Sequence, residues 1–234
     1  MKKFLIISIL LLSVIDSHGR IFTSIDDRTV EAEIKSYDET SNVVELKRNN
    51  GMLFKVNANI FSKNDQLFIK DFAKIESFMD EKLFSLEFSE KIIKRTKQED
   101  TVYSASGEVI AYEILVKNHS KYSFEDVVIS YKIFYEDEEF NQDTRKKETR
   151  VESKKGNYSI QNLLSKTDKV FDTSEIVLLK TEFNSDYYLV GGGNPDTRDS
   201  LIGIWVKASI EDIDKNIYTQ NFSSPLSIQE KYTW

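Results

Sequence analysis

The chain has no cysteine, two histidines, two prolines and eight glycines among its 234 residues. The absence of cysteine excludes disulfide bonds, thiolate zinc sites and thiol nucleophiles. The small number of Gly and Pro residues excludes collagen-like and low-complexity chains. Hydrophobic residues make up 40% and charged residues 30%, a balance typical of a globular protein. The length predicts one or two domains, which without disulfides must be stabilised by their packed cores.

Catalytic motifs are correspondingly scarce. His119 is the one histidine outside the N-terminal segment, and the sequence contains no G-x-S-x-G motif to accompany it. The glycine-rich stretch 191–195 lacks the Lys-Ser/Thr pair of a phosphate-binding loop. We therefore expect a protein that is not an enzyme, with no catalytic residue, metal ion or cofactor. A carboxylate-dependent hydrolase stays open as a third interpretation, because no spacing selects one pair among the many acidic side chains.

Residues 1–19 have the pattern of a secretory signal peptide. Two lysines precede an apolar run, Phe4–Ile15, and small residues at 17 and 19 come before a cleavage site that would leave Arg20 first. This run is shorter than the roughly 20 residues that a membrane-spanning helix needs. We therefore expect cleavage, export to the periplasm or the extracellular space, and no membrane span in the mature chain. The mature net charge of about −8 argues against nucleic acid as a partner.

Residues 20–70 have the pattern of a small β domain. Hydrophobic residues at 30, 32 and 34 alternate with charged residues, as in a half-buried strand. A second strand is predicted at Val43–Lys47, and Met52–Val56 is predicted to pair back onto it. The Asn-Gly pair at 50–51 predicts the hairpin turn between them, because these residues tolerate positive φ. Short twisted strands of this kind predict an SH3-like small barrel.

A helix is predicted to follow this domain, with residues 71–88 as the connecting segment. Ser62 and Asp65 have the spacing of a capping box, in which each side chain accepts a hydrogen bond from the other residue's backbone N–H. Apolar residues then recur at steps of three and four, at Phe68, Phe72, Ile75, Met79, Leu83 and Leu86. The opposite face is not rich in Lys and Arg, so we expect the apolar stripe to pack on the two flanking domains rather than on a membrane.

Several segments of the first domain together resemble a known family. They are, in order, Arg20–Thr23, Val30–Ala32, Val44–Leu46, Asn50–Gly51, Val56 and Phe61–Ile69. These residues are similar to the first Sla homology domain, named after a fungal endocytic and actin-assembly adaptor, and to a domain near the N-terminus of many secreted bacterial proteins. The chain differs from the family pattern at Phe22, where Trp is common, and at Asp27, where Gly is common.

The resemblance implies an SH3-like domain that binds peptides. In the fungal adaptor this domain recognises an Asn-Pro-Phe-x-Asp sorting signal and needs a basic residue just before the Asn-Gly turn. Arg48 holds that position here, with Lys47 beside it. A guanidinium can pair with the Asp of such a signal through two hydrogen bonds. Phe22, Phe54 and Phe68 are candidates for an aromatic floor, and the alternative is that these three belong to the core.

Residues 89–234 show strand patterns throughout. Hydrophobic side chains alternate with more polar ones at 127–135 and at 202–210. Further strands are predicted at Ile92–Lys97, Glu108–Lys117, Thr144–Glu152, Tyr158–Leu163, Asp172–Glu182 and Tyr218–Ser223. Seven or eight short antiparallel strands predict an immunoglobulin-like β-sandwich. The acidic residues 136–139 and the basic residues 145–147 predict a hairpin with cross-strand ion pairs.

These patterns predict a mainly β protein, with an N-terminal SH3-like small barrel, a connecting helix and a C-terminal sandwich. The function they favour is that of an exported, non-enzymatic adaptor, whose first domain binds a peptide or protein in the cell envelope. The alternative is a carbohydrate-binding or structural envelope protein that acts through the sandwich. Exposed aromatic residues on one sandwich face, such as Trp205, would favour that alternative.

Overall fold

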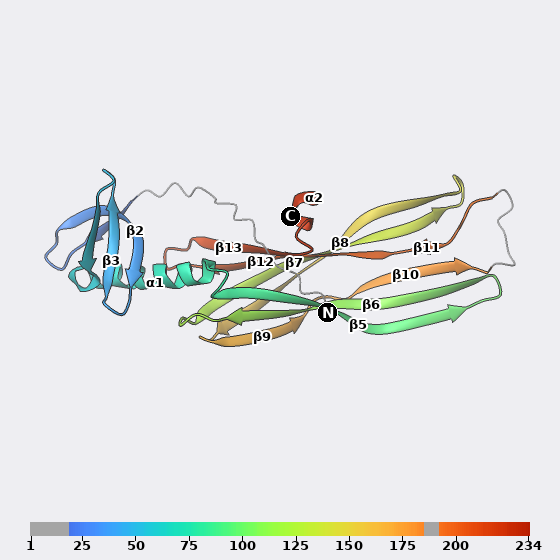
Figure 1. Ribbon diagram of the computed structural model, residues 1–234, viewed down its shortest axis with the longest axis horizontal. Helices are drawn as coiled ribbons and strands as arrows, with labels where there is room; N and C mark the ends of the chain where they lie inside the picture. The colour runs from blue at the N-terminus through green and yellow to red at the C-terminus, as the bar shows by residue number, and fades with distance from the viewer. Residues whose placement is uncertain (1–18, 185–191) are drawn as a thin grey trace.

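The computed structural model describes residues 19–184 and 192–234. The predicted signal peptide, apart from Gly19, lies outside the described residues, and so does Gly191 of the glycine-rich stretch. The described chain forms three antiparallel sheets and one long helix, α1, and its shape is elongated, with a small sheet at one end and two larger sheets at the other (Figure 1). Within these two ranges no helix has the length and apolar character that crossing a bilayer requires.

The N-terminal sheet contains four strands in chain order, β1 (Arg20–Thr23), β2 (Thr29–Asp38), β3 (Val43–Arg48) and β4 (Leu53–Asn57). The predicted hairpin between β3 and β4 is confirmed: Gly51 has a φ of 84°, and its N–H donates to the Arg48 carbonyl at 2.8 Å. In the described residues no strand pairing joins β4 to β1, so the sheet is open and is not a closed barrel. A short 3-10 helix, Ala58–Ile60, leads from β4 toward α1.

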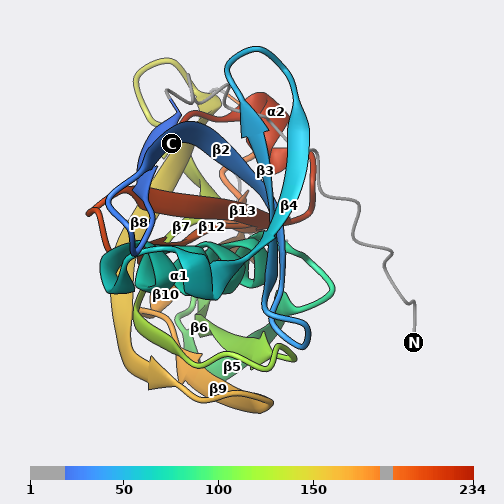
Figure 2. The same ribbon diagram turned by 90° about the vertical axis from the view of Figure 1, so that its left-hand side faces the viewer.

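One face of this sheet forms a small core with the first half of α1 (Lys63–Met79), which lies along the sheet (Figure 2). Alternate positions on β2 and β3 point to this face, because side chains along a strand alternate between its two sides. The fully buried members are Phe22, Ala32, Val44, Leu46 and Ile69. The strand predicted from the alternation at residues 30–34 is therefore half-buried, as expected, with Ala32 and Ile34 in the core.

The N-terminus of α1 has one of the two hydrogen bonds of the predicted capping box. The Ser62 hydroxyl accepts a hydrogen bond from the Asp65 N–H at 3.3 Å, as predicted. The Ser62 N–H, however, donates to the Thr23 carbonyl at 2.7 Å. The Asp65 carboxylate instead accepts from the Thr23 N–H at 2.9 Å and from the Ser62 hydroxyl at 2.8 Å. The cap therefore also fastens strand β1 to the start of the helix.

The helix ends at Met79, earlier than the apolar pattern predicted. A turn replaces the last predicted helical residues: the Leu83 N–H donates to the Asp80 carbonyl at 2.8 Å, and the Lys82 N–H donates to the Asp80 carboxylate at 2.9 Å. An Asp side chain that binds the backbone two residues on is typical of such turns. Leu86, predicted on the helix face, is a buried residue of strand β5.

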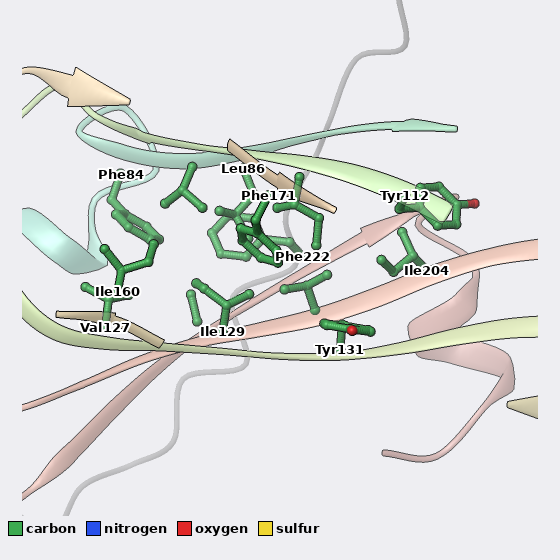
Figure 3. Close-up of a cluster of buried hydrophobic side chains, with 14 of the residues drawn as sticks. Phe84, Leu86, Tyr112, Val127, Ile129, Tyr131, Ile160, Phe171, Ile204 and Phe222 are labelled. Carbon is green, nitrogen blue, oxygen red and sulfur yellow. The ribbon is translucent and has the colours of Figure 1, made fainter. Parts of the chain in front are cut away.

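The two larger sheets follow the helix. The first has the order β11 (Thr197–Arg198), β10 (Ile176–Phe183), β6 (Tyr103–Asn118) and β5 (Phe84–Glu99), with β9 (Thr167–Asp172) also paired to β6. The second has the order β13 (Ile217–Ser224), β12 (Ser200–Glu211), β7 (Phe124–Asn141) and β8 (Lys146–Leu163). Their facing sides share the main core, in which residues of both sheets interleave (Figure 3). A short helix, α2 (Ile228–Lys231), packs on β12 and β13.

Several strands in this region are longer than predicted, and the division into strands differs from the predicted one at two places. The predicted segments 144–152 and 158–163 belong, from Lys146 onward, to one strand, β8, which pairs with β7 along its whole length. The lack of a side chain on Gly156 leaves room for the ring of Tyr131 on the paired strand. Conversely, the predicted strand Asp172–Glu182 is divided into β9 and β10, which pair with successive parts of β6. The predicted charged hairpin is confirmed, with Lys147 Nζ 3.7 Å from the Glu138 carboxylate.

Helix α1 packs on both cores, as its apolar stripe predicted. Ile69 belongs to the small core, whereas Ile75 and Phe78 belong to the main core. Phe78 is fully buried, and its ring centroid lies 4.5 Å from that of Phe84 and 5.5 Å from that of Phe124. The predicted stripe included Met79, which is 38% exposed. One helix is therefore an integral part of two hydrophobic cores.

We expect Phe78→Ala to lower the free energy of unfolding by about 3–5 kcal/mol, because it leaves a cavity among packed aromatic rings. The matched control is Met79→Ala, which removes a half-exposed side chain from the adjacent position and should cost about 0.5 kcal/mol. Urea denaturation followed by circular dichroism measures both values. Equal losses for the two variants would contradict the assignment of Phe78 to the main core.

Candidate functional site

The candidate peptide site lies at one end of the core-facing side of the N-terminal sheet. Strand pairing places Arg20 opposite Ala32, and Ala32 opposite Arg48, so three strands contribute one row of residues. Directly opposed residues on antiparallel strands point to the same face of the sheet. Ala32 is fully buried and small, and an arginine therefore lies on each side of it at the edge of the small core.

Each of these arginines lies over a phenylalanine ring. The Arg48 guanidinium carbon is 4.9 Å from the centroid of Phe54, and that of Arg20 is 4.0 Å from the centroid of Phe68. Both rings are half-buried and pack against the small core. Contacts of this kind contribute roughly 0.5–1 kcal/mol at exposed positions. They hold each cation close to an apolar surface.

The two arginines differ in how their hydrogen-bond donors are used. Arg20 Nε lies 3.2 Å from the buried carboxylate of Asp65, and its Nη1 lies 2.6 Å from the carboxylate of Asp214. Arg48 is exposed and forms no ion pair within residues 19–184 and 192–234. The Arg48 guanidinium is therefore available to a carboxylate from another molecule, whereas Arg20 is committed to the fold.

Two of the five residues predicted for the peptide site do not contribute to this surface. Phe22 is fully buried, with its ring centroid 5.4 Å from that of Phe61 and 6.2 Å from that of Phe68, so it belongs to the core and is not part of an exposed floor. Lys47 precedes Arg48 on the same strand and points to the opposite face of the sheet. Arg48, Phe54 and Phe68 remain as candidates.

Arg20 belongs to the same row but was not predicted as a site residue. Nothing in the sequence pattern pairs it with Arg48, and only the strand register aligns the two residues. Its partner Asp214 lies on the turn between β12 and β13, far along the chain. A second link is close by, because the Ile213 N–H donates to the Asp71 carboxylate at 2.8 Å. The candidate site is thus fixed to the second half of the molecule.

Trp205 and His119 are the residues that bear on the alternative functions. Trp205 points to the outer face of its sheet, but it is only 9% exposed, because Trp234 packs edge-on against it with a centroid distance of 5.3 Å. His119 lies in a turn, where its backbone N–H donates to the Leu83 carbonyl. No group of three or more His, Cys, Asp or Glu side chains in the described part of the chain has the arrangement of a metal site.

Comparison with known proteins gives structural similarity but no family. No protein-family model and no curated protein matches the sequence. Among solved structures, a similar chain is the X-ray structure of a Northeast Structural Genomics Consortium target, SoR45, with 8% sequence identity and a TM-score of 0.27. The alignment covers 66% of this chain and 96% of that chain. A TM-score of this size does not establish a shared fold.

We expect Arg20→Ala to lower the free energy of unfolding by about 2 kcal/mol, because the buried Asp65 carboxylate loses its cation. The matched variant Arg48→Ala loses only an exposed contact with Phe54 and should cost less than about 1 kcal/mol. Urea denaturation of both variants checks the difference. A loss at Arg48 as large as that at Arg20 would show that Arg48 too is part of the structural framework.

Proposed function

We propose that this protein is an exported, non-enzymatic adaptor whose N-terminal sheet binds a peptide that contains both an aromatic and an acidic residue. The observation on which the proposal depends is the difference between the two arginines at the site. Arg20 is paired with two carboxylates, whereas Arg48 is exposed, lies over Phe54, and has no carboxylate partner within the described residues. An arginine held in this way matches the planar, two-oxygen geometry of a carboxylate.

Two backbone details of the open N-terminal sheet support the proposal that it is a Sla homology domain. The hairpin after Arg48 has its glycine in the left-handed region, as the Asn-Gly motif of the family requires. Asp27, which stands where the family often has Gly, has a φ of 64°. Only a few residue types tolerate such a conformation, and Gly and Asp are two of them. The backbone at this position therefore suits the family pattern despite the substitution.

In the proposed complex, the Arg48 guanidinium pairs with the acidic side chain of the peptide through two parallel hydrogen bonds. The half-buried rings of Phe54 and Phe68 offer apolar surface to the aromatic side chain of the peptide. We further propose that the two larger sheets form an immunoglobulin-like sandwich that positions this module in the cell envelope. The ion pair of Arg20 with Asp214 would then hold the binding face at a fixed angle to the sandwich.

A fluorescein-labelled peptide with the sequence pattern Asn-Pro-Phe-x-Asp tests the proposal by fluorescence anisotropy. We expect Arg48→Glu to weaken binding at least about tenfold, because it replaces a charge-assisted hydrogen bond with repulsion between two carboxylates. Lys47→Glu is the matched control, since it makes the same change of charge at the adjacent position on the opposite face of the sheet. It should leave the affinity unchanged.

Replacement of the peptide's Asp by Asn should reduce binding to the wild-type protein and should make little difference to the Arg48→Glu variant. Affinity capture from cell envelope extract with the same two variants tests the site without assuming a peptide sequence. Identical sets of proteins captured by the wild type and by Arg48→Glu would contradict the proposal, as would equal effects of the Arg48 and Lys47 substitutions.

A further inference from the structure

The outer face of the sheet β13-β12-β7-β8 has three lysines close together, Lys132, Lys155 and Lys207. Strand register places Lys132 on β7 directly between Trp205 on β12 and Lys155 on β8. Lys207 follows Trp205 by two residues on β12 and so points to the same face. The inward side chains of these strands fill the main core, which leaves the lysines on the side away from the facing sheet.

Trp234 lies over this lysine cluster. Its ring centroid is 4.4 Å from Lys207 Nζ and 5.3 Å from Lys132 Nζ. Lys132 Nζ also donates a hydrogen bond to the Thr233 carbonyl at 3.1 Å. Trp234 is 38% exposed, whereas Trp205 beneath it is 9% exposed. Of the two indoles, Trp234 is therefore the one that a ligand can contact.

No carboxylate of the described residues lies within ion-pair distance of the cluster. None of the three ammonium groups forms an ion pair with a carboxylate of the described residues. Burial lowers the pKa of Lys132 and of Lys207, and the neighbouring ammonium group of the cluster lowers each pKa further. The chain has 39 acidic residues against 32 basic ones, so the lack of an acidic partner here does not reflect a shortage of acids.

A pocket of about 490 Å³ opens beside the cluster. Lys132, Lys155 and Trp234 line it together with the hydroxyl-bearing Ser130 and the amide-bearing Asn157. Cross-strand pairing fixes the relative positions of these side chains, because Ser130 lies opposite Asn157, and Lys132 lies opposite Lys155. The pocket thus combines cations, an indole surface and neutral hydrogen-bonding groups on a rigid sheet.

We propose that this pocket binds an anionic saccharide. The carboxylate or sulfate group of the sugar would pair with Lys132 and Lys155, and Lys207 would add to the positive potential. The apolar face of the sugar ring would lie on the indole of Trp234, while Ser130 and Asn157 would bond to its hydroxyl groups. A neutral sugar lacks the charge that would pair with the lysines, and a peptide of acidic residues lacks the flat apolar ring face that would lie on the indole.

Intrinsic fluorescence tests the proposal directly, because the chain has two tryptophans and both lie at this cluster. Titration with trigalacturonate, a carboxylated trisaccharide, should produce a saturable change in emission, and calorimetry should give the same affinity. Lys155→Ala should weaken binding about tenfold through the loss of one charge-assisted hydrogen bond. Lys154→Ala is the matched control, since this lysine lies on the opposite face of β8 and its loss changes the net charge equally.

Three comparisons separate this proposal from its alternatives. The neutral trisaccharide of galactose should bind at least about tenfold more weakly than trigalacturonate, and so should sodium sulfate and an acidic peptide. Arg48→Glu should leave trigalacturonate binding unchanged, which makes the result independent of the proposed peptide site. Equal affinities for charged and neutral sugars would overturn the proposal. Equal losses in the Lys155 and Lys154 variants would do the same, as would equal binding of sulfate or of the acidic peptide.

Discussion

The arrangement of the whole molecule depends on helix α1 being shared between two cores. Its first half supplies Ile69 to the small core, and its second half supplies Ile75 and Phe78 to the main core. Because the helix contributes buried side chains to both cores, the N-terminal sheet cannot move relative to the two larger sheets without disturbing this packing. The ion pair of Arg20 with Asp214 adds a polar link at the same junction, and Arg20 also neutralises the buried Asp65. Loss of either ion pair of Arg20 would therefore destabilise the junction between the N-terminal sheet and the rest of the molecule.

The same junction explains why two neighbouring arginines have different roles. Both belong to one row across the sheet, and both lie over a phenylalanine ring. Arg20 lies near two carboxylates, one on α1 and one on the turn between β12 and β13, and it is held by both. Arg48 lies on the far side of Ala32, where no carboxylate of the described residues lies within ion-pair distance. Position in the fold, and not residue type, therefore distinguishes a structural cation from one that can take part in binding.

Local features were predictable from the sequence, whereas features that depend on distant contacts were not. The hairpin at Gly51 follows from a backbone requirement confined to two residues, and the Ser62 cap follows from a spacing of three. The opposite orientations of Lys47 and Arg48 could also be predicted, because adjacent residues of a strand point to opposite faces of the sheet. The burial of Phe22 beneath Phe68, however, depends on how the helix lies on the sheet. The lysine cluster depends on the register of three strands, which no local pattern fixes.

The two cationic surfaces also show that the net charge of this chain is a poor guide to its local charge. The chain as a whole has a net charge of −7, which opposes the approach of anions at long range. At physiological ionic strength this repulsion is screened within about 8 Å, so the nearest side chains decide what binds. Arg48 lies on the sheet at one end of α1, and the lysine cluster lies on a sheet at its other end. The two surfaces therefore lie on different sheets, so the two proposed ligands would not compete for the same residues.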